Sequence, residues 1–247
     1  MIAATAGRVL RQLRHDPRTI AMLLLVPSLL LGLLYLLWAD VPAPPGQPGI
    51  FDRVGLTMLG IFPFVVMFLV TSIAMLRERT SGTLERLLTT PLSRPALLAG
   101  YGAAFGLAAA VQALLTVTVA ATVYDLSVAG PLALVVLIAV VGAVLGVALG
   151  LLASAFARSE FQAVQFMPVI VLPQFFLCGL LVPREQMDGW LQAVSDVLPL
   201  TYAVDALQEV GRSPDPTGTM WLDLAVVAGA AVLALALAAG TLRRRTS

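Results

Sequence analysis

The sequence predicts an all-α integral membrane protein, with residues 1–247 forming one domain of six transmembrane helices. Hydrophobic residues make up 59% of the chain and charged residues 12%, whereas a soluble domain carries about 25% charged residues. Six apolar runs are each long enough to cross the hydrocarbon core as a helix, which takes about 20 residues. The charged residues gather in the segments between those runs. These observations together exclude an ordinary soluble domain.

The six predicted spans follow the apolar runs in chain order. An Arg-rich flank precedes the first run, as in a signal peptide, but this run is longer than the roughly 7–15 residues of a signal core. Pro27 would kink the first span, and Pro168 and Pro173 would bend or unwind the fifth, because each proline removes a backbone donor. The spans are predicted at 20–38, 54–76, 96–123, 132–156, 161–182 and 221–242.

The fourth run carries three glycines spaced four residues apart, Gly142, Gly146 and Gly150. Such a ridge of small residues lets another helix approach closely in a membrane. Two interpretations fit this spacing, namely packing within one subunit and contact between two subunits. The sequence leaves both open.

The two sets of loops differ in charge. All fifteen basic residues are arginine. With the spans above, twelve arginines and four acidic residues lie on the side of both chain ends, against three arginines and ten acidic residues on the other side. Arginine-rich loops stay in the cytoplasm. The sequence therefore predicts that both termini are cytoplasmic.

Residues 1–18 and 183–218 are predicted to hold helices that do not span. Val9, Leu10 and Leu13 share one helical face, which is typical of an interfacial helix on an anionic leaflet; a basic flank without any helix fits as well. Residues 183–218 predict two short external helices in the outer leaflet, as a bent or re-entrant pair, because neither is long enough to cross. The site candidates in this external loop are Trp190, Tyr202 and Asp205.

Between the second and third spans lies a polar segment, residues 77–95, with four arginines. A short helix is predicted inside it: Gly82 and Thr83 open the helix, Glu85 suits the first turn, and Pro91 ends it. Leucines three and four residues apart would form its apolar face, namely Leu84, Leu87 and Leu88. A solvated loop with one helical turn resting on the headgroups is the alternative, and periodicity alone favours it.

Two stretches resemble the type-2 permeases of ATP-binding-cassette (ABC) exporters. Within 78–94 the resemblance lies in a Gly-Thr-Leu-Glu core starting at Gly82, a Thr-Pro pair ending at Pro91, and a small residue before Arg94. Within 175–206 it lies in the order and spacing of Phe-Phe-Leu-Cys-Gly, Val-Pro, Met-Asp-Gly-Trp-Leu and Leu-Pro-Leu-Thr-Tyr. Gln208 departs from the pattern, because these permeases often carry an arginine there. With the six-span plan, the resemblance covers nearly the whole chain.

The resemblance implies the membrane subunit of an exporter of drug-like or lipid-like cargo, in a bacterial cytoplasmic membrane. It implies that residues 77–95 form a coupling helix that docks on a separate ATP-hydrolysing subunit, present in two copies. ATP and Mg would bind to that partner, and this chain would bind no cofactor. A second permease copy, or a related permease, would complete the pore; no nucleic-acid partner is expected. The residues implied to couple to the ATPase are Glu78, Gly82, Thr83, Leu84, Glu85, Arg86 and Leu87.

The resemblance further implies that the second and fifth spans line the path between two permease subunits. Aromatic and Met side chains suit a broad apolar cargo, although lipid-facing helices carry them too. The expected cargo is a hydrophobic or amphipathic small molecule or a lipid. The candidates for the lining are Phe62, Met67, Phe68, Phe166, Gln174 and Phe175.

Residue types that the sequence lacks exclude several functions. The chain contains no Lys, so it cannot form a standard P-loop or a Schiff base. One Cys and one His cannot form a typical zinc site. No ionisable residue is predicted at the membrane centre, which argues against a transporter driven by protons or sodium. The alternatives are a self-contained six-span transporter or channel, and a scaffold or immunity protein on the same fold.

Overall fold

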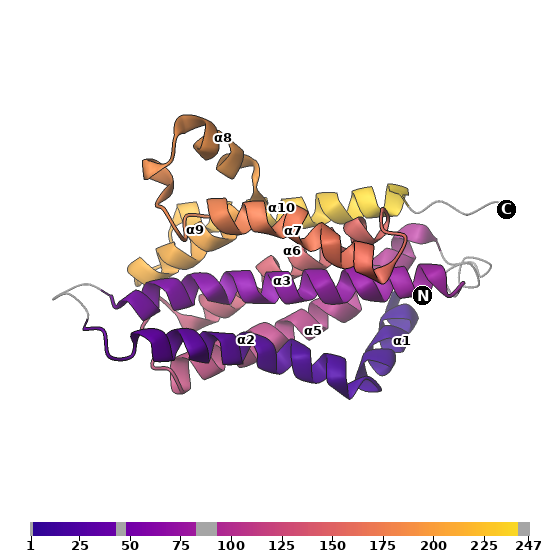
Figure 1. Ribbon diagram of the computed structural model, residues 1–247, viewed down its shortest axis with the longest axis horizontal. Helices are drawn as coiled ribbons and strands as arrows, with labels where there is room; N and C mark the ends of the chain where they lie inside the picture. The colour runs from indigo at the N-terminus through magenta and orange to yellow at the C-terminus, as the bar shows by residue number, and fades with distance from the viewer. Residues whose placement is uncertain (1, 43–47, 83–92, 242–247) are drawn as a thin grey trace.

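The computed structural model describes residues 2–42, 48–82 and 93–241. Within these ranges the protein is helical, without any strand. Six helices are long and apolar enough to cross a membrane (Figure 1), which confirms the predicted fold class. They are α2 (Pro17–Trp38), α3 (Ile50–Thr80), α5 (Arg94–Thr122), α6 (Leu132–Ser154), α7 (Glu160–Leu177) and α10 (Gly218–Thr241). The shorter helices are α1 (Ile2–Arg14), the 3-10 helix η1 (Arg184–Gln186), α8 (Gly189–Val197) and α9 (Pro199–Arg212).

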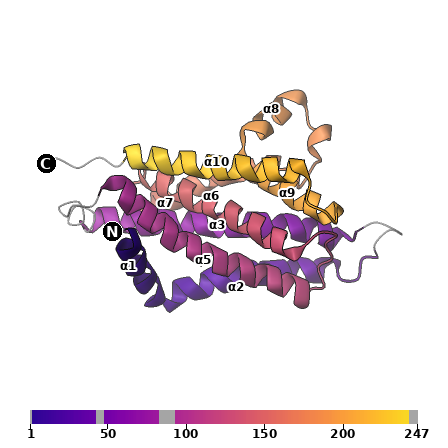
Figure 2. The same cartoon turned by 180° about the vertical axis from the view of Figure 1, so that it is seen from behind.

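The long helices run between two ends of an elongated bundle (Figures 1 and 2). We call one the α1 end: it holds α1, the end of α3, the start of α5, the end of α6, the start of α7 and the end of α10. The opposite end, from which α8 projects, is the α8 end. Because α1 and the end of α10 share one end, the path of the chain agrees with six crossings.

Helices α3 and α6 form the centre of the bundle. Helix α3 has 31 residues, about 46 Å at 1.5 Å per residue, and its Phe64, Met67 and Phe68 are fully buried. A Cβ added to Gly146 would lie 2.3 Å from the carbonyl oxygen of Phe64, and one on Gly150 would lie 2.5 Å from that of Phe68. These two glycines of the ridge therefore pack against α3 inside the subunit, as the first of the two interpretations predicts.

Glycines with a left-handed backbone follow two of the long helices. Gly82 has φ +73° after α3, and Gly179 has φ +87° after α7, a conformation that commonly ends a helix. Helix α7 consequently stops at Leu177, five residues before its predicted end, while α3 continues to Thr80, four residues beyond its predicted end. Gly82 thus ends the second span, whereas it was predicted to open the next helix. The predicted coupling helix itself, residues 83–91, lies outside the described residues.

The chain turns sharply between α1 and α2 because Asp16 and Pro17 start a new helix. The Asp16 carboxylate accepts hydrogen bonds from the Thr19 backbone N–H at 3.1 Å and from the Thr19 hydroxyl at 2.7 Å. These bonds lower the pKa of Asp16 below its usual value. Pro17 occupies the first turn, where its missing donor is not needed. Residues 2–14 are thus a helix, and its buried Thr5 and Val9 face the bundle.

Two short helices occur between α7 and α10, as predicted, but they differ in their surroundings. Helix α8 stands away from the bundle (Figure 1), and Trp190 on it is 68% exposed. Helix α9 packs against α3, α6 and α10, and its Leu200, Val204 and Leu207 are fully buried. The pair is therefore one helix in the bundle and one outside it. The single cysteine, Cys178, lies buried where α7 ends.

Candidate functional site

Three consecutive charged residues at the end of α3 bind three other parts of the bundle. Arg77 pairs with Glu160 at the start of α7, with Nε–Oε1 and Nη2–Oε2 distances of 2.8 and 3.1 Å. Arg79 donates from Nη1 to the carbonyl oxygen of Ser154 at the end of α6. Glu78, between them, binds Arg8 of α1. We call Arg77, Glu78 and Arg79 the α3 tip. It forms the start of the segment 77–95, which the resemblance implies couples to an ATPase.

The Glu78 contact belongs to a buried cluster that joins α1, α3 and α5. Arg8 Nη1 lies 3.0 Å from Glu78 Oε1, and Arg8 Nη2 donates to the Tyr101 hydroxyl at 2.5 Å. The Arg8 guanidinium carbon also lies 5.7 Å from the centre of the Tyr101 ring, within cation–π range. We call Arg8, Glu78 and Tyr101 the α1 clamp.

The predicted coupling residues differ in what the structure shows of them. Glu78 is only 5% exposed, and its carboxylate binds Arg8 inside the bundle. That Glu78 couples to an ATPase stays a prediction. Among the other predicted coupling residues, Gly82 is described and ends α3. The remaining five, Thr83, Leu84, Glu85, Arg86 and Leu87, lie outside the described residues.

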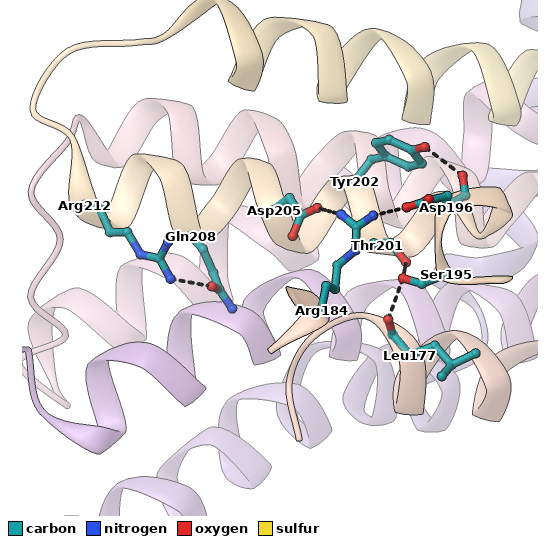
Figure 3. A network of polar contacts seen from close by, with 9 residues as sticks. All are labelled: Leu177, Arg184, Ser195, Asp196, Thr201, Tyr202, Asp205, Gln208 and Arg212. Carbon is teal, nitrogen blue, oxygen red and sulfur yellow. Dashed lines mark hydrogen bonds and ion pairs between the residues drawn. The ribbon is translucent and has the colours of Figure 1, made fainter. Parts of the chain in front are cut away.

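A second polar network holds the external loop at the α8 end (Figure 3). Arg184 is its centre, because its guanidinium binds Asp196 of α8 with one nitrogen and Asp205 of α9 with another. The Tyr202 hydroxyl donates to the Asp196 carbonyl oxygen at 2.7 Å. Ser195 donates to the carbonyl oxygen of Leu177 at 2.8 Å. The end of α7, α8 and α9 are thus connected by side chains.

Burial and charge act in opposite directions on Asp205. Burial raises the pKa of the Asp205 carboxyl above its usual value, and the adjacent Arg184 guanidinium opposes the rise. Asp205 and Tyr202 were predicted site residues, and both belong to this network: Asp205 binds Arg184, and Tyr202 binds the backbone of Asp196. Trp190, the third, is on the exposed part of α8 and has no place in this network.

A cleft of about 510 Å³ lies beside the network, between the start of α3, η1, α9 and the start of α10. It is lined by all three arginines of the predicted external side, Arg53, Arg184 and Arg212. Gln208 donates to the Thr57 hydroxyl at 3.3 Å and accepts from Arg212 at 3.1 Å, so it connects α9 to α3. In the described part of the chain, acidic, His and Cys side chains form no group that could hold a metal ion.

The candidates for the translocation path fall into two sets. Met67 and Phe68 are fully buried in the core of this chain, so they do not line a surface in the structure described. Gln174 is 3% exposed, and its amide is satisfied there: it donates to the Ile170 carbonyl oxygen at 3.0 Å and accepts from the Leu200 N–H at 3.3 Å. The remaining candidates are half-buried at the edge of the core, namely Phe62, Phe166 and Phe175.

Residues central to both networks were not predicted as site residues. Arg8 belonged to a basic flank, and Tyr101 to an uncharged span, so neither had a visible partner in the sequence. Arg184 carried one available signal, since it is one of three arginines among ten acidic residues on its side. A cation among so many carboxylates indicates an ion pair.

Comparison with known proteins gives consistent results. A family model described as "ABC-2 type transporter" matches residues 2–210. A "probable multidrug ABC transporter permease YbhR" of Escherichia coli K12 is 26% identical over 168 residues, which cover 68% of this chain and 46% of that protein. "ABC transporter G family member 20" of Dictyostelium discoideum is 26% identical over 68% of this chain and 23% of its own length. The chain thus spans less than half of each of these relatives.

Proposed function

This chain belongs to the ABC-2 type transporter family, and on that basis we propose that it is the membrane subunit of an ABC exporter, powered by a separate ATPase subunit. It is a multi-pass membrane protein with six apolar helices long enough to span. The α1 end would face the cytoplasm, because the predicted cytoplasmic loops carry twelve of the fifteen arginines. Two ATPase subunits, with their ATP and Mg, would bind at this end.

The α3 tip is the observation that carries the proposal. The segment 77–95 would couple to the ATPase, and a movement of the docked segment would pull on the end of α3. The α3 tip is bonded to α7 through Arg77, to α1 through Glu78, and to α6 through Arg79. Arg8, the partner of Glu78 on α1, extends the connection to Tyr101 of α5. A displacement of the α3 tip would be transmitted to four helices, so a local movement could change the arrangement of the whole bundle. Helix α7, with Pro168 and Pro173 inside it, is the most deformable of them.

A second permease copy, or a related permease, would complete the pore. Only 17% of the apolar window of α7 is buried inside this chain, so most of this helix faces outwards. Lipid or a second subunit would cover such a face. We propose the second subunit, with the half-buried Phe166 and Phe175 near the path between the copies. The cargo would be hydrophobic or amphipathic, a drug-like molecule or a lipid; the Escherichia coli relative YbhR is described as a probable multidrug ABC transporter permease.

The test is purification of the tagged chain from its host in mild detergent, with identification of what accompanies it by mass spectrometry. We expect a stoichiometric partner with a P-loop. Reversing charge at Glu85 and Arg86 should release that partner while the permease still inserts into the membrane. A control reversal at Asp215, outside the predicted coupling segment, should leave the partner bound. Recovery of the chain without any nucleotide-binding partner would contradict the proposal, and flux driven by a proton gradient alone would favour the self-contained transporter.

A further inference from the structure

A groove of about 450 Å³ opens at the α1 end between α1, α2, α3 and α5. Helices α2 and α3 diverge towards the α1 end, and α1 lies across the wide end of the space between them (Figure 1). Its volume is within the range of pockets that hold drug-sized molecules, about 300–1,000 Å³. Two residues of the α1 clamp, Glu78 and Tyr101, form part of its wall, but the contacts of the clamp do not fill the space.

The groove changes from apolar to polar along its length. On α3 its wall passes from Val66 through Ile73 to Arg77, and on α2 from Val26 to Thr19, with Asp16 preceding that helix. The distance from residue 66 to residue 77 is about 16 Å along a helix axis. One leaflet of the hydrocarbon core measures about 15 Å, half of about 30 Å. The groove thus has the depth and the polarity gradient of one leaflet.

The polar end of the groove offers groups of both charges. Arg77 uses Nε and Nη2 for Glu160, and its side chain is 61% exposed. Asp16 is held as a carboxylate by its hydrogen bonds from Thr19. Glu78 also lines the groove, and its buried Oε2 accepts no hydrogen bond from the residues that the structure describes. A ligand with a phosphate near Arg77 and an ammonium near the carboxylates would complement this arrangement.

We propose that the groove binds one phospholipid with an amine headgroup, taken from the leaflet at the α1 end. One acyl chain lies between α2 and α3, the phosphate forms an ion pair with Arg77, and the ammonium group forms an ion pair with Asp16. The lipid holds α2 apart from α3 and supports α1 against the bundle. This role is distinct from the transport function proposed above, since the lipid is a resident component whether or not the chain exports anything.

The test is native mass spectrometry of the purified full-length protein. The protein is stripped of lipid in detergent and titrated with phosphatidylethanolamine or phosphatidylglycerol carrying the same acyl chains. We expect one tightly retained phosphatidylethanolamine per chain, bound several-fold more tightly than phosphatidylglycerol. Val26→Trp, which fills the groove, should abolish that retention. Leu36→Trp is the matched control, because Leu36 is exposed on the same helix but does not line the groove.

A second variant separates headgroup recognition from the apolar fit. Asp16→Asn keeps a side-chain oxygen for Thr19 but removes the charge, and we expect about fivefold weaker binding of phosphatidylethanolamine with unchanged binding of phosphatidylglycerol. Equal retention of both lipids by the wild type would overturn the amine preference. The whole proposal fails if Val26→Trp retains lipid as the wild type does. It also fails if Val26→Trp changes only the number of associated copies, which would mean that a second copy fills the groove.

Discussion

At the scale of single residues, the sequence does not show which polar side chains are buried, and Glu78 is an example. Glu78 looked like a surface residue, because it stands in an Arg-rich segment beside a predicted docking helix. The sequence could not show that α3 continues through this position and turns the side chain towards Arg8 and Tyr101. The partner, Arg8, lies 70 residues away in the sequence, so no local pattern of residues could predict this contact.

The α1 clamp should contribute more to stability than the exposed ion pair beside it. Glu78→Gln leaves the Arg8 guanidinium without its charged partner in a mostly buried place, and we expect a loss of about 1–3 kcal/mol. Glu160→Gln makes the same change in the Arg77 pair, whose carboxylate side chain is 52% exposed, and should cost about 0–1 kcal/mol. Thermal unfolding in detergent compares the two variants. Equal losses of stability in the two variants would mean that the Arg8–Glu78 pair contributes no more than an exposed ion pair.

Gln112 is a buried polar side chain that lacks a hydrogen-bond partner within the described ranges of the chain. It is fully buried in α5, and neither its amide nitrogen nor its amide oxygen has a hydrogen-bond partner among the described residues. Gln112→Leu should therefore leave stability unchanged or raise it by about 1 kcal/mol. Gln174→Leu is the matched control, since Gln174 makes two backbone bonds, and it should lower stability by about 1–3 kcal/mol. The prediction is wrong if unfolding shows the two variants to be alike.

At the scale of helices, the sequence predicted most of what the structure contains. The six spans follow from hydrophobic length, and the two short external helices follow from amphipathic spacing. The helix ends were less predictable: α7 stops early at Gly179, and α3 passes beyond its last apolar residue into charged sequence. The glycine ridge of α6 predicted a close approach but could not name the partner, because small-residue spacing is the same for contacts within and between subunits.

The ridge makes a graded prediction within one helix. Gly146→Ala and Gly150→Ala place a Cβ against the α3 backbone at 2.3 and 2.5 Å, so each should destabilise the protein by about 1–3 kcal/mol through overpacking. Gly142→Ala meets its nearest atoms at 3.8 Å, and should be neutral or stabilising by up to about 1 kcal/mol, because alanine favours the helix. Chemical unfolding in mixed micelles measures all three. Equal changes in stability for the three variants would contradict a close α3–α6 contact at Gly146 and Gly150.

At the scale of the whole molecule, the end of α3 concentrates the connections between helices. Sequence resemblance pointed to this region, but only the tertiary structure shows which helices its residues bind. Arg77 binds α7, Glu78 binds α1, and Arg79 binds α6. The residues predicted to line the translocation path also require the tertiary structure, because an aromatic or Met side chain in a span faces either the core or the outside. Met67 and Phe68 face the core, and only packing reveals this.

The link from α3 to α7 should matter for coupling more than for stability. Arg77→Glu and Glu160→Arg each create a like-charge pair and should lower the ATP hydrolysis of the reconstituted complex several-fold, with unfolding temperatures close to the wild type. The double variant restores the ion pair in reverse and should recover hydrolysis. Failure of the double variant to recover, with both single variants impaired, would show that the charge pair itself is not the link.

The burial of Cys178 has a practical consequence for mapping the protein in its membrane. The chain has one cysteine, and it is enclosed, so the native protein provides a silent background for thiol-reactive labels without further engineering. A cysteine introduced for His15, exposed at the α1 end, and another for Val197, 80% exposed on α8, would each be the single accessible thiol. In intact cells, an impermeant maleimide should modify the Val197→Cys protein and spare the His15→Cys protein.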